Sequence, residues 1–301
     1  MKPINPISAY TGLRNIVLIG SLFGFHGLLN RSLLIDGINE NFIVTARITI
    51  VTLLLGIYCL KEFINEINIE FFLKGSFTGI LAIFIPGWTF IYALKNISSG
   101  LQSIFISTIP LFTVFWVLLF FKEEKITKLK IISVLIGLIG LIILFLSGAT
   151  GLEGEGNLIV GGVLALIGVQ GLALSNITNK KHSQYIPAKT YLFTQWLVGC
   201  TISIGIFFSL GGVVDTLNVS EFSKLMGLVF IDIFNYSLFF YTIKRLSATF
   251  TTLVDYVVPT VGIAVGYIFL DEIVNNVFYV TLLLIFISLY LAVREEAETL
   301  S

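Results

Sequence analysis

Residues 92–124 read YALKNISSGLQSIFISTIPLFTVFWVLLFFKEE, and residues 241–273 read YTIKRLSATFTTLVDYVVPTVGIAVGYIFLDEI. A shift of 149 positions aligns these two stretches without a gap. The alignment matches six pairs of residues: Tyr92/Tyr241, Lys95/Lys244, Ser98/Ser247, Pro110/Pro259, Phe120/Phe269 and Glu123/Glu272. Apolar residues match easily by chance in such a chain, but proline, lysine and glutamate do not. The sequence therefore predicts a duplication, with one homologous half in residues 1–150 and the other in residues 151–301.

The composition is that of a membrane protein. Of the 301 residues, 56% are hydrophobic and 12% are charged, and the mean hydropathy is +0.97. A soluble domain carries about 25% charged residues. The 18 basic residues are balanced by 18 acidic ones, so the chain has no overall positive field and no nucleic-acid partner is expected.

The apolar residues fall into segments of membrane-spanning length. A bilayer core about 30 Å thick needs about 20 apolar residues per helix. Ten such segments can be placed, at residues 15–34, 42–60, 74–94, 97–121, 131–147, 158–179, 190–210, 225–243, 247–269 and 276–293. The predicted fold is an all-α polytopic membrane protein with ten transmembrane helices. Each half holds five of them, an odd number, so the second half must be inverted relative to the first.

The distribution of basic residues orients the chain, because cytoplasmic loops retain lysine and arginine. With the amino terminus inside, all but four of the 18 basic residues fall in cytoplasmic segments. Arg31, Lys95 and Lys224 fall in outer loops, and Arg47 lies within the second helix. Both termini are therefore predicted to be cytoplasmic. The Gly-rich linker 148–156, which joins the halves, is predicted to lie outside.

Four ionisable residues fall inside the predicted spans: His26, Arg47, Asp232 and Asp255. Charged groups in hydrocarbon cost at least about 2.5–3.5 kcal/mol, so such residues are candidates for substrate binding or coupling. Both aspartates correspond to isoleucines in the first half, and this asymmetry favours a specific task. The alternative is that the aspartates pair with Arg47 or with hydroxyl groups and only fix helix packing.

Other polar or helix-breaking residues lie within the spans. Tyr236 shares a helical face with Asp232, and we expect it to line a substrate site together with Trp88 and Asn176. Pro110 and Pro259 lie inside the fourth and ninth predicted helices. We expect a kink at each of them, because proline removes a backbone hydrogen bond and clashes with the preceding turn. A purely structural role for these kinks is the alternative.

The sequence lacks three common enzyme signatures. The sequence has no Gly-x-x-x-x-Gly-Lys-Ser/Thr loop, no His-Glu-x-x-His and no Gly-x-Ser-x-Gly. We therefore predict no catalytic residues and no cofactor, and the absence of a P-loop argues against a built-in ATPase. The two histidines, His26 and His182, also argue against a metal site.

The two aligned stretches resemble the drug/metabolite transporter superfamily, and in particular its EamA-type members with ten helices. Each copy carries the pattern Tyr-x-x-Lys-x-x-Ser … Pro … Glu, with proline and glutamate 13 positions apart. In the first copy either Glu123 or Glu124 can be the family acid. The glycine that usually precedes this acid is Lys122 in one copy and Asp271 in the other.

This resemblance implies a secondary transporter that exports small polar metabolites such as amino acids, by alternating access between its two halves. The expected partners are a small-molecule substrate, the lipid bilayer and protons exchanged at Asp232, Asp255 and His26. The expected location is a bacterial inner membrane. Two alternatives stay open: an integral membrane enzyme acting on lipid headgroups, and a membrane sensor that transports nothing. The sequence does not predict an oligomeric state.

Overall fold

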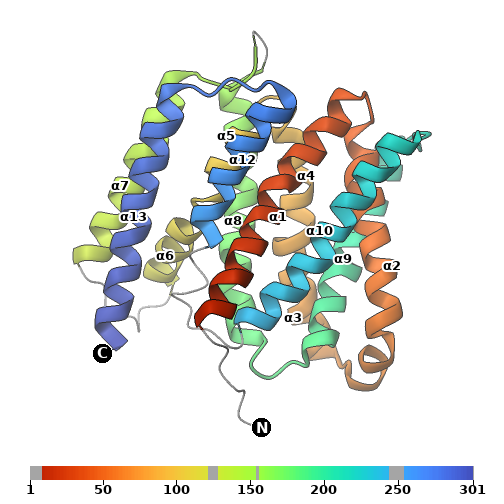
Figure 1. The fold of residues 1–301 in the computed structure, drawn as a ribbon. Coiled ribbons are helices and arrows are strands. Elements are labelled where there is room, and N and C mark those ends of the chain that lie inside the picture. Colours follow the sequence, from red (N-terminus) through yellow and green to blue (C-terminus); the bar gives the residue numbers. More distant parts are fainter. Residues whose placement is uncertain (1–8, 121–127, 154–155, 244–253, 301) are drawn as a thin grey trace.

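The computed structural model describes residues 9–120, 128–153, 156–243 and 254–300, which form helices joined by short connections (Figure 1). The third of the ten spans contains a π-helical segment, η1, between α3 and α4, and the fourth is interrupted between α5 and α6. The helices are α1 (Ala9–Ile35), α2 (Glu40–Glu66), α3 (Ile69–Gly79), η1 (Ile80–Phe84), α4 (Ile85–Ala93), α5 (Ser99–Ile106), α6 (Ile109–Phe120), α7 (Lys128–Ser147), α8 (Leu158–His182), α9 (Ala188–Ser209), α10 (Val219–Ile243), α12 (Val254–Leu270) and α13 (Asn276–Leu300).

These helices confirm the predicted fold class. Within the described ranges, seven spans are long and apolar enough to cross a membrane. Shorter apolar helices at residues 131–147, 257–270 and 276–288 occupy the fifth, ninth and tenth positions. Residues 247–253 of the ninth predicted segment lie outside the described part of the chain, as do Glu123 and Glu124. The helix α1 begins and α13 ends at the same end of the bundle, as an even number of spans requires (Figure 1).

Asparagine side chains cap the starts of two helices, and glycines follow the ends of two others. The side chain of Asn39 accepts hydrogen bonds from two backbone amides of the first turn of α2, at 2.9 and 3.4 Å. Asn157 does the same for α8, at 3.0 and 3.1 Å. Such N-caps satisfy amides that have no partner within the helix. Gly37 and Gly211, with φ of 86° and 70°, follow α1 and α9 and reverse the chain in a conformation that glycine adopts without strain.

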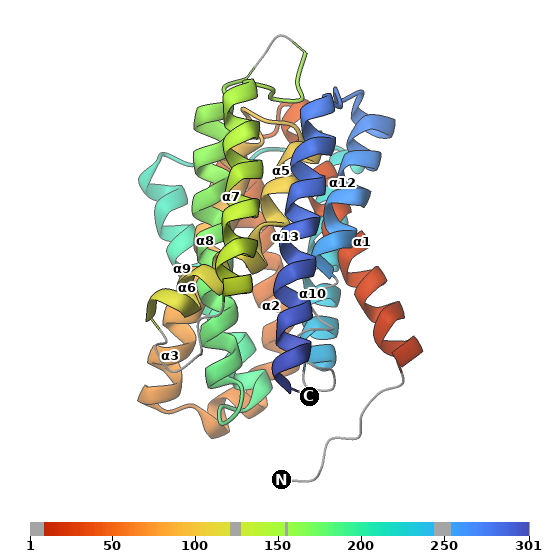
Figure 2. The same cartoon turned by 90° about the vertical axis from the view of Figure 1, so that its left-hand side faces the viewer.

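Contacts between spans follow an approximate two-fold symmetry. The symmetry exchanges α1 with α8, α2 with α9, the third span with α10, the fourth span with α12, and α7 with α13. Under this exchange, α1–α12 maps onto α8–α6, α4–α8 maps onto α10–α1, and α3–α9 maps onto α10–α2. In all six of these pairs the two helices are packed against each other. The pairs α2–α9, α5–α12 and α7–α13 map onto themselves, and α7 and α13 lie side by side at one edge of the bundle (Figures 1 and 2). Two inverted repeats produce this pattern.

The fourth span corrects one prediction. We expected a kink at Pro110 inside a continuous helix, but the span is interrupted at Ser107 and Thr108, and Pro110 is the second residue of α6. The amide of Thr108 closes a tight turn onto the carbonyl of Phe105 at 3.0 Å. Proline fits the first turn of a helix because its missing N–H would have no helical partner there. Pro259, in contrast, lies inside α12 as expected.

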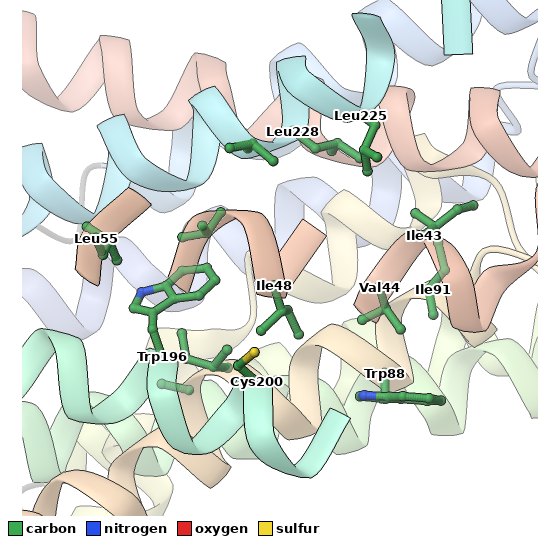
Figure 3. Close-up of a cluster of buried hydrophobic side chains, with 14 of the residues drawn as sticks. Ile43, Val44, Ile48, Leu55, Trp88, Ile91, Trp196, Cys200, Leu225 and Leu228 are labelled. Atoms are coloured by element: carbon green, nitrogen blue, oxygen red, sulfur yellow. The ribbon is translucent and has the colours of Figure 1, made fainter. Parts of the chain in front are cut away.

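The largest apolar cluster lies where α2, the third span, α9 and α10 meet. It includes Ile48, Trp88, Trp196, Cys200 and Leu228, each at most 8% exposed. Figure 3 shows these side chains between the helices. Lipid is as apolar as leucine, so close packing rather than the hydrophobic effect holds such helices together. The cluster fixes α2 against α9 and α10, and α2 and α10 carry two of the charged groups described next.

Candidate functional site

Three of the four predicted intramembrane ionisable residues meet in one place. Arg47 of α2 forms an ion pair with Asp232 of α10, with 3.3 Å between Nη1 and Oδ2. His26 of α1 lies beside both, with its Nε2 at 3.5 Å from Oδ1 of Asp232 and in contact with Nη1 of Arg47. We call these three residues, with Asn30 and Asn235, the polar cluster. It joins α1 and α2 of the first half to α10 of the second.

The ion pair is almost completely buried. The side chains of Arg47 and Asp232 are 8% and 4% exposed. Opposite charges in contact reduce the penalty that each charge alone would suffer in the membrane interior. Neither charge can therefore lose its partner cheaply, and a group that replaces one partner must bring the same charge.

Asn30 positions the histidine from one turn further along α1. Its amide nitrogen lies 3.1 Å from Nδ1 of His26 and donates to the carbonyl oxygen of His26 at 2.9 Å. With Nδ1 as the acceptor, a neutral imidazole carries its proton on Nε2. That nitrogen contacts both Asp232 and Arg47, so it can donate to the carboxylate in this tautomer and accept from the guanidinium in the other.

Six buried polar atoms on α2, α9 and α10 have no hydrogen-bond partner within the described part of the chain. Asp232 Oδ2 is one of them, because it lies near Arg47 without hydrogen-bond geometry. The other atoms are Arg47 Nε, Asn235 Oδ1, Thr45 Oγ1, Gln195 Oε1 and Trp196 Nε1. Each buried polar atom without a partner costs about 1–3 kcal/mol. At the ion pair, the open donor of Arg47 and the open acceptor of Asp232 can bind a ligand that offers both kinds of group.

Tyr236 lies one turn after Asp232 on α10 and contacts two other spans. Its hydroxyl donates to the carbonyl of Ala82 in η1 at 3.2 Å. Pro86, four residues after Ala82, has no N–H to donate to that carbonyl, and the tyrosine takes its place. The ring of Tyr236 meets the ring of Trp196 edge to face, with 5.3 Å between centroids. Tyr236 thus connects the polar cluster to the irregular turn of the third span.

Among the described side chains, no hydrogen bond or ion pair joins Trp88 or Asn176 to the cluster. Trp88 is buried and donates from Nε1 to the hydroxyl of Ser203 at 2.9 Å, which is a packing contact between the third span and α9. Asn176 is half-buried on α8. Asp255 lies in α12, but its side chain is outside the described part of the structure.

Two functional candidates were not predicted from the sequence. Asn30 was missed although it stands four residues after His26, a spacing that puts both on one helical face. Glu272 matched its counterpart in the repeat, but no role was predicted for it. The structure buries its carboxylate against the start of α5. No group of three potential metal ligands occurs among the described residues.

Comparisons with known proteins agree with this architecture. The model of a family described as EamA-like transporters matches residues 11–146 and again residues 159–294. A solved structure, described only as the crystal structure of a protein, is similar over 94% of this chain and 99% of its own, with a TM-score of 0.60 and 17% identity. At that identity the likeness concerns the fold alone. A search of curated proteins finds no match.

Proposed function

The chain belongs to the EamA-like transporter family of the drug/metabolite transporter superfamily, and on that premise we propose that it is a secondary transporter of small polar metabolites such as amino acids. The proposed substrate site is the polar cluster. The expected direction is export, across the inner membrane of a bacterium, with both termini in the cytoplasm. The proposed moving units are the two halves, residues 1–150 and 151–301.

The observation that carries this proposal is the buried Arg47–Asp232 pair with its unpartnered neighbours. A zwitterionic substrate can place an ammonium group on Asp232 and a carboxylate on Arg47, so that both buried charges keep an opposite charge. Trp196 supplies an unpartnered N–H and, with Tyr236, an aromatic surface. A substrate with one charge would leave either Arg47 or Asp232 without compensation.

Alternating access accounts for the position of the cluster. Arg47 belongs to the first half and Asp232 to the second, so relative rotation of the halves changes the distance between them. Inverted-repeat transporters bind their substrates near the bilayer midplane between the repeats. Proton coupling is part of the proposal, through His26, Asp232 and Asp255. An uncoupler should then abolish uphill transport.

The deciding experiment is a flux assay in proteoliposomes with a panel of amino acids, amines and nucleosides. We expect at least one zwitterion to be transported and Asp232→Asn to abolish its flux. Asp271→Asn makes the same change of charge at an exposed loop residue and should transport normally. If nothing in the panel moves, with or without a pH gradient, the transporter proposal fails and a sensor or a lipid-headgroup enzyme takes its place.

A further inference from the structure

Glu272 connects the two halves at a distance from the polar cluster. It lies in the connection between α12 and α13 and is only 6% exposed. Its Oε1 accepts a hydrogen bond from the amide of Ser99 at 2.6 Å. Its Oε2 accepts from the amide of Gly100 at 2.9 Å and from the hydroxyl of Ser99 at 3.0 Å. Glu272 belongs to the second half, and these donors form the first turn of α5 in the first half.

This contact is strong for a physical reason. The first amides of a helix have no partner within it and carry the positive end of the helix dipole. A carboxylate supplies both the missing acceptor and the complementary charge, and such charge-assisted bonds are roughly twice as strong as neutral ones. The start of α5 is therefore held to the second half by a buried anion and not by apolar packing alone.

The linker between the halves is hydrogen-bonded to the residues beside this contact. The amide of Ser98 donates to the carbonyl of Thr150 at 2.9 Å, and the amide of Ile273 donates to the carbonyl of Gly151 at 3.0 Å. The linker is thus bonded to both sides, to the residue before α5 and to the residue after Glu272. We call the end of the bundle that carries these contacts the linker face.

The helix α5 packs closely against both α12 and α1. On one side α5 meets α12 so closely that a Cβ on Gly262 would lie 2.5 Å from the Cβ of Ser103. On the other side Ser99 packs against Gly27 of α1, where an added Cβ would lie 3.4 Å from it. Gly27 directly follows His26 of the polar cluster. Movement of the start of α5 away from α1 and α12 would therefore uncover the cluster from this face.

We propose that Glu272 is a latch that holds the linker face closed, and that its release from α5 opens the polar cluster to that side. The inference rests on the proposed function, because a transporter must open each face in turn. Glu272 is the family acid of the second repeat. The proposal gives this residue a gating role that its position in the sequence does not reveal.

Thiol labelling tests the latch without any substrate. The two native cysteines, Cys59 and Cys200, are buried and are replaced by alanine. Single reporter cysteines are then introduced at Ser103, in the contact between α5 and α12, or at Thr78, which lies nearer the opposite face; both are buried. The protein is reconstituted in nanodiscs, where both faces are accessible, and the rate of reaction with a membrane-impermeant maleimide is measured.

We expect Glu272→Gln to raise the labelling rate at position 103 at least tenfold, roughly the factor for loss of one charge-assisted hydrogen bond. The rate at position 78 should not rise, because only the linker face opens. Asp271→Asn, the matched control beside it, should leave both rates unchanged. A Glu272→Gln protein whose position 103 stays protected overturns the proposal, and so does an equal rise at both positions.

A second variant covers the case in which Glu272→Gln does not fold. Ser99→Ala removes only the hydroxyl donor and should give a smaller increase at position 103; no increase there also overturns the latch. The labelling result is independent of the flux panel. Faster labelling with no transported substrate would keep the latch and reject the transporter proposal, whereas active transport with unchanged labelling would reject the latch alone.

Discussion

At the scale of single residues, Arg47 and Asp232 show how a membrane interior accommodates charge. Each is buried, and each has the other as its opposite charge at 3.3 Å. His26 contacts both and is itself held by Asn30. A buried pair of this kind adds little stability over an apolar pair, but it is costly to break from one side. Stability alone therefore does not explain the pair, and this favours a binding role.

Substitution of Arg47 tests whether Arg47 and Asp232 stabilise each other. Arg47→Met leaves Asp232 as an uncompensated buried charge and should lower the free energy of unfolding by about 3–5 kcal/mol. The double variant Arg47→Met/Asp232→Asn, which carries neither charge, should be more stable than Arg47→Met while transporting nothing. Thermal unfolding in detergent, with the single Asp232→Asn variant completing the cycle, measures the difference. Strictly additive effects of the two substitutions would show that the residues do not interact.

At the scale of elements, the third span packs unusually closely against α9. The turn η1 follows Gly79, whose position leaves no room for a side chain: an added Cβ would lie 2.5 Å from the carbonyl oxygen of Gln195. Backbone atoms of a packed helix cannot move aside as a flexible side chain can. Gly79 therefore sets the distance between the third span and α9, and with it the position of Ala82 beneath Tyr236.

A pair of glycine substitutions tests that role. Gly79→Ala forces η1 and α9 apart and should lower the free energy of unfolding by about 1–3 kcal/mol, the usual range for overpacking. Gly205→Ala is the control, because an added Cβ there meets no atom within 4 Å. We expect it to change stability by less than about 1 kcal/mol. Equal melting temperatures for the two variants would contradict the close packing.

At the scale of the whole molecule, the inverted repeat organises the bundle. Under the two-fold symmetry, three packed pairs of helices map onto themselves, and three other packed pairs map onto three further packed pairs. The polar cluster departs from this symmetry, because the positions of Arg47 and Asp232 correspond to Trp196 and Ile83 in the other half. A symmetric scaffold thus carries a charged site that has no symmetric counterpart, as expected if the substrate has a fixed orientation.

Cysteine labelling in intact cells tests the predicted orientation. In a cysteine-free background, Val214→Cys in the exposed connection between α9 and α10 should react with an impermeant maleimide, because that connection is predicted to lie outside. Gln184→Cys is the matched probe; it is also exposed, but in the lysine-rich connection between α8 and α9, and should react only after lysis. The reverse pattern would place both termini outside.

The spans, the repeat and the identity of the intramembrane ionisable residues can all be read from the amino-acid sequence. This is possible because apolar length, cation distribution and repeat register are local or additive properties that need no three-dimensional information. The pairing of Arg47 with Asp232 was decided only by tertiary structure, since the two residues are far apart in the chain and many partners were available. The same holds for Glu272. Its repeat position marked it, but only the approach of α5 to the second half supplied the backbone amides that its carboxylate binds.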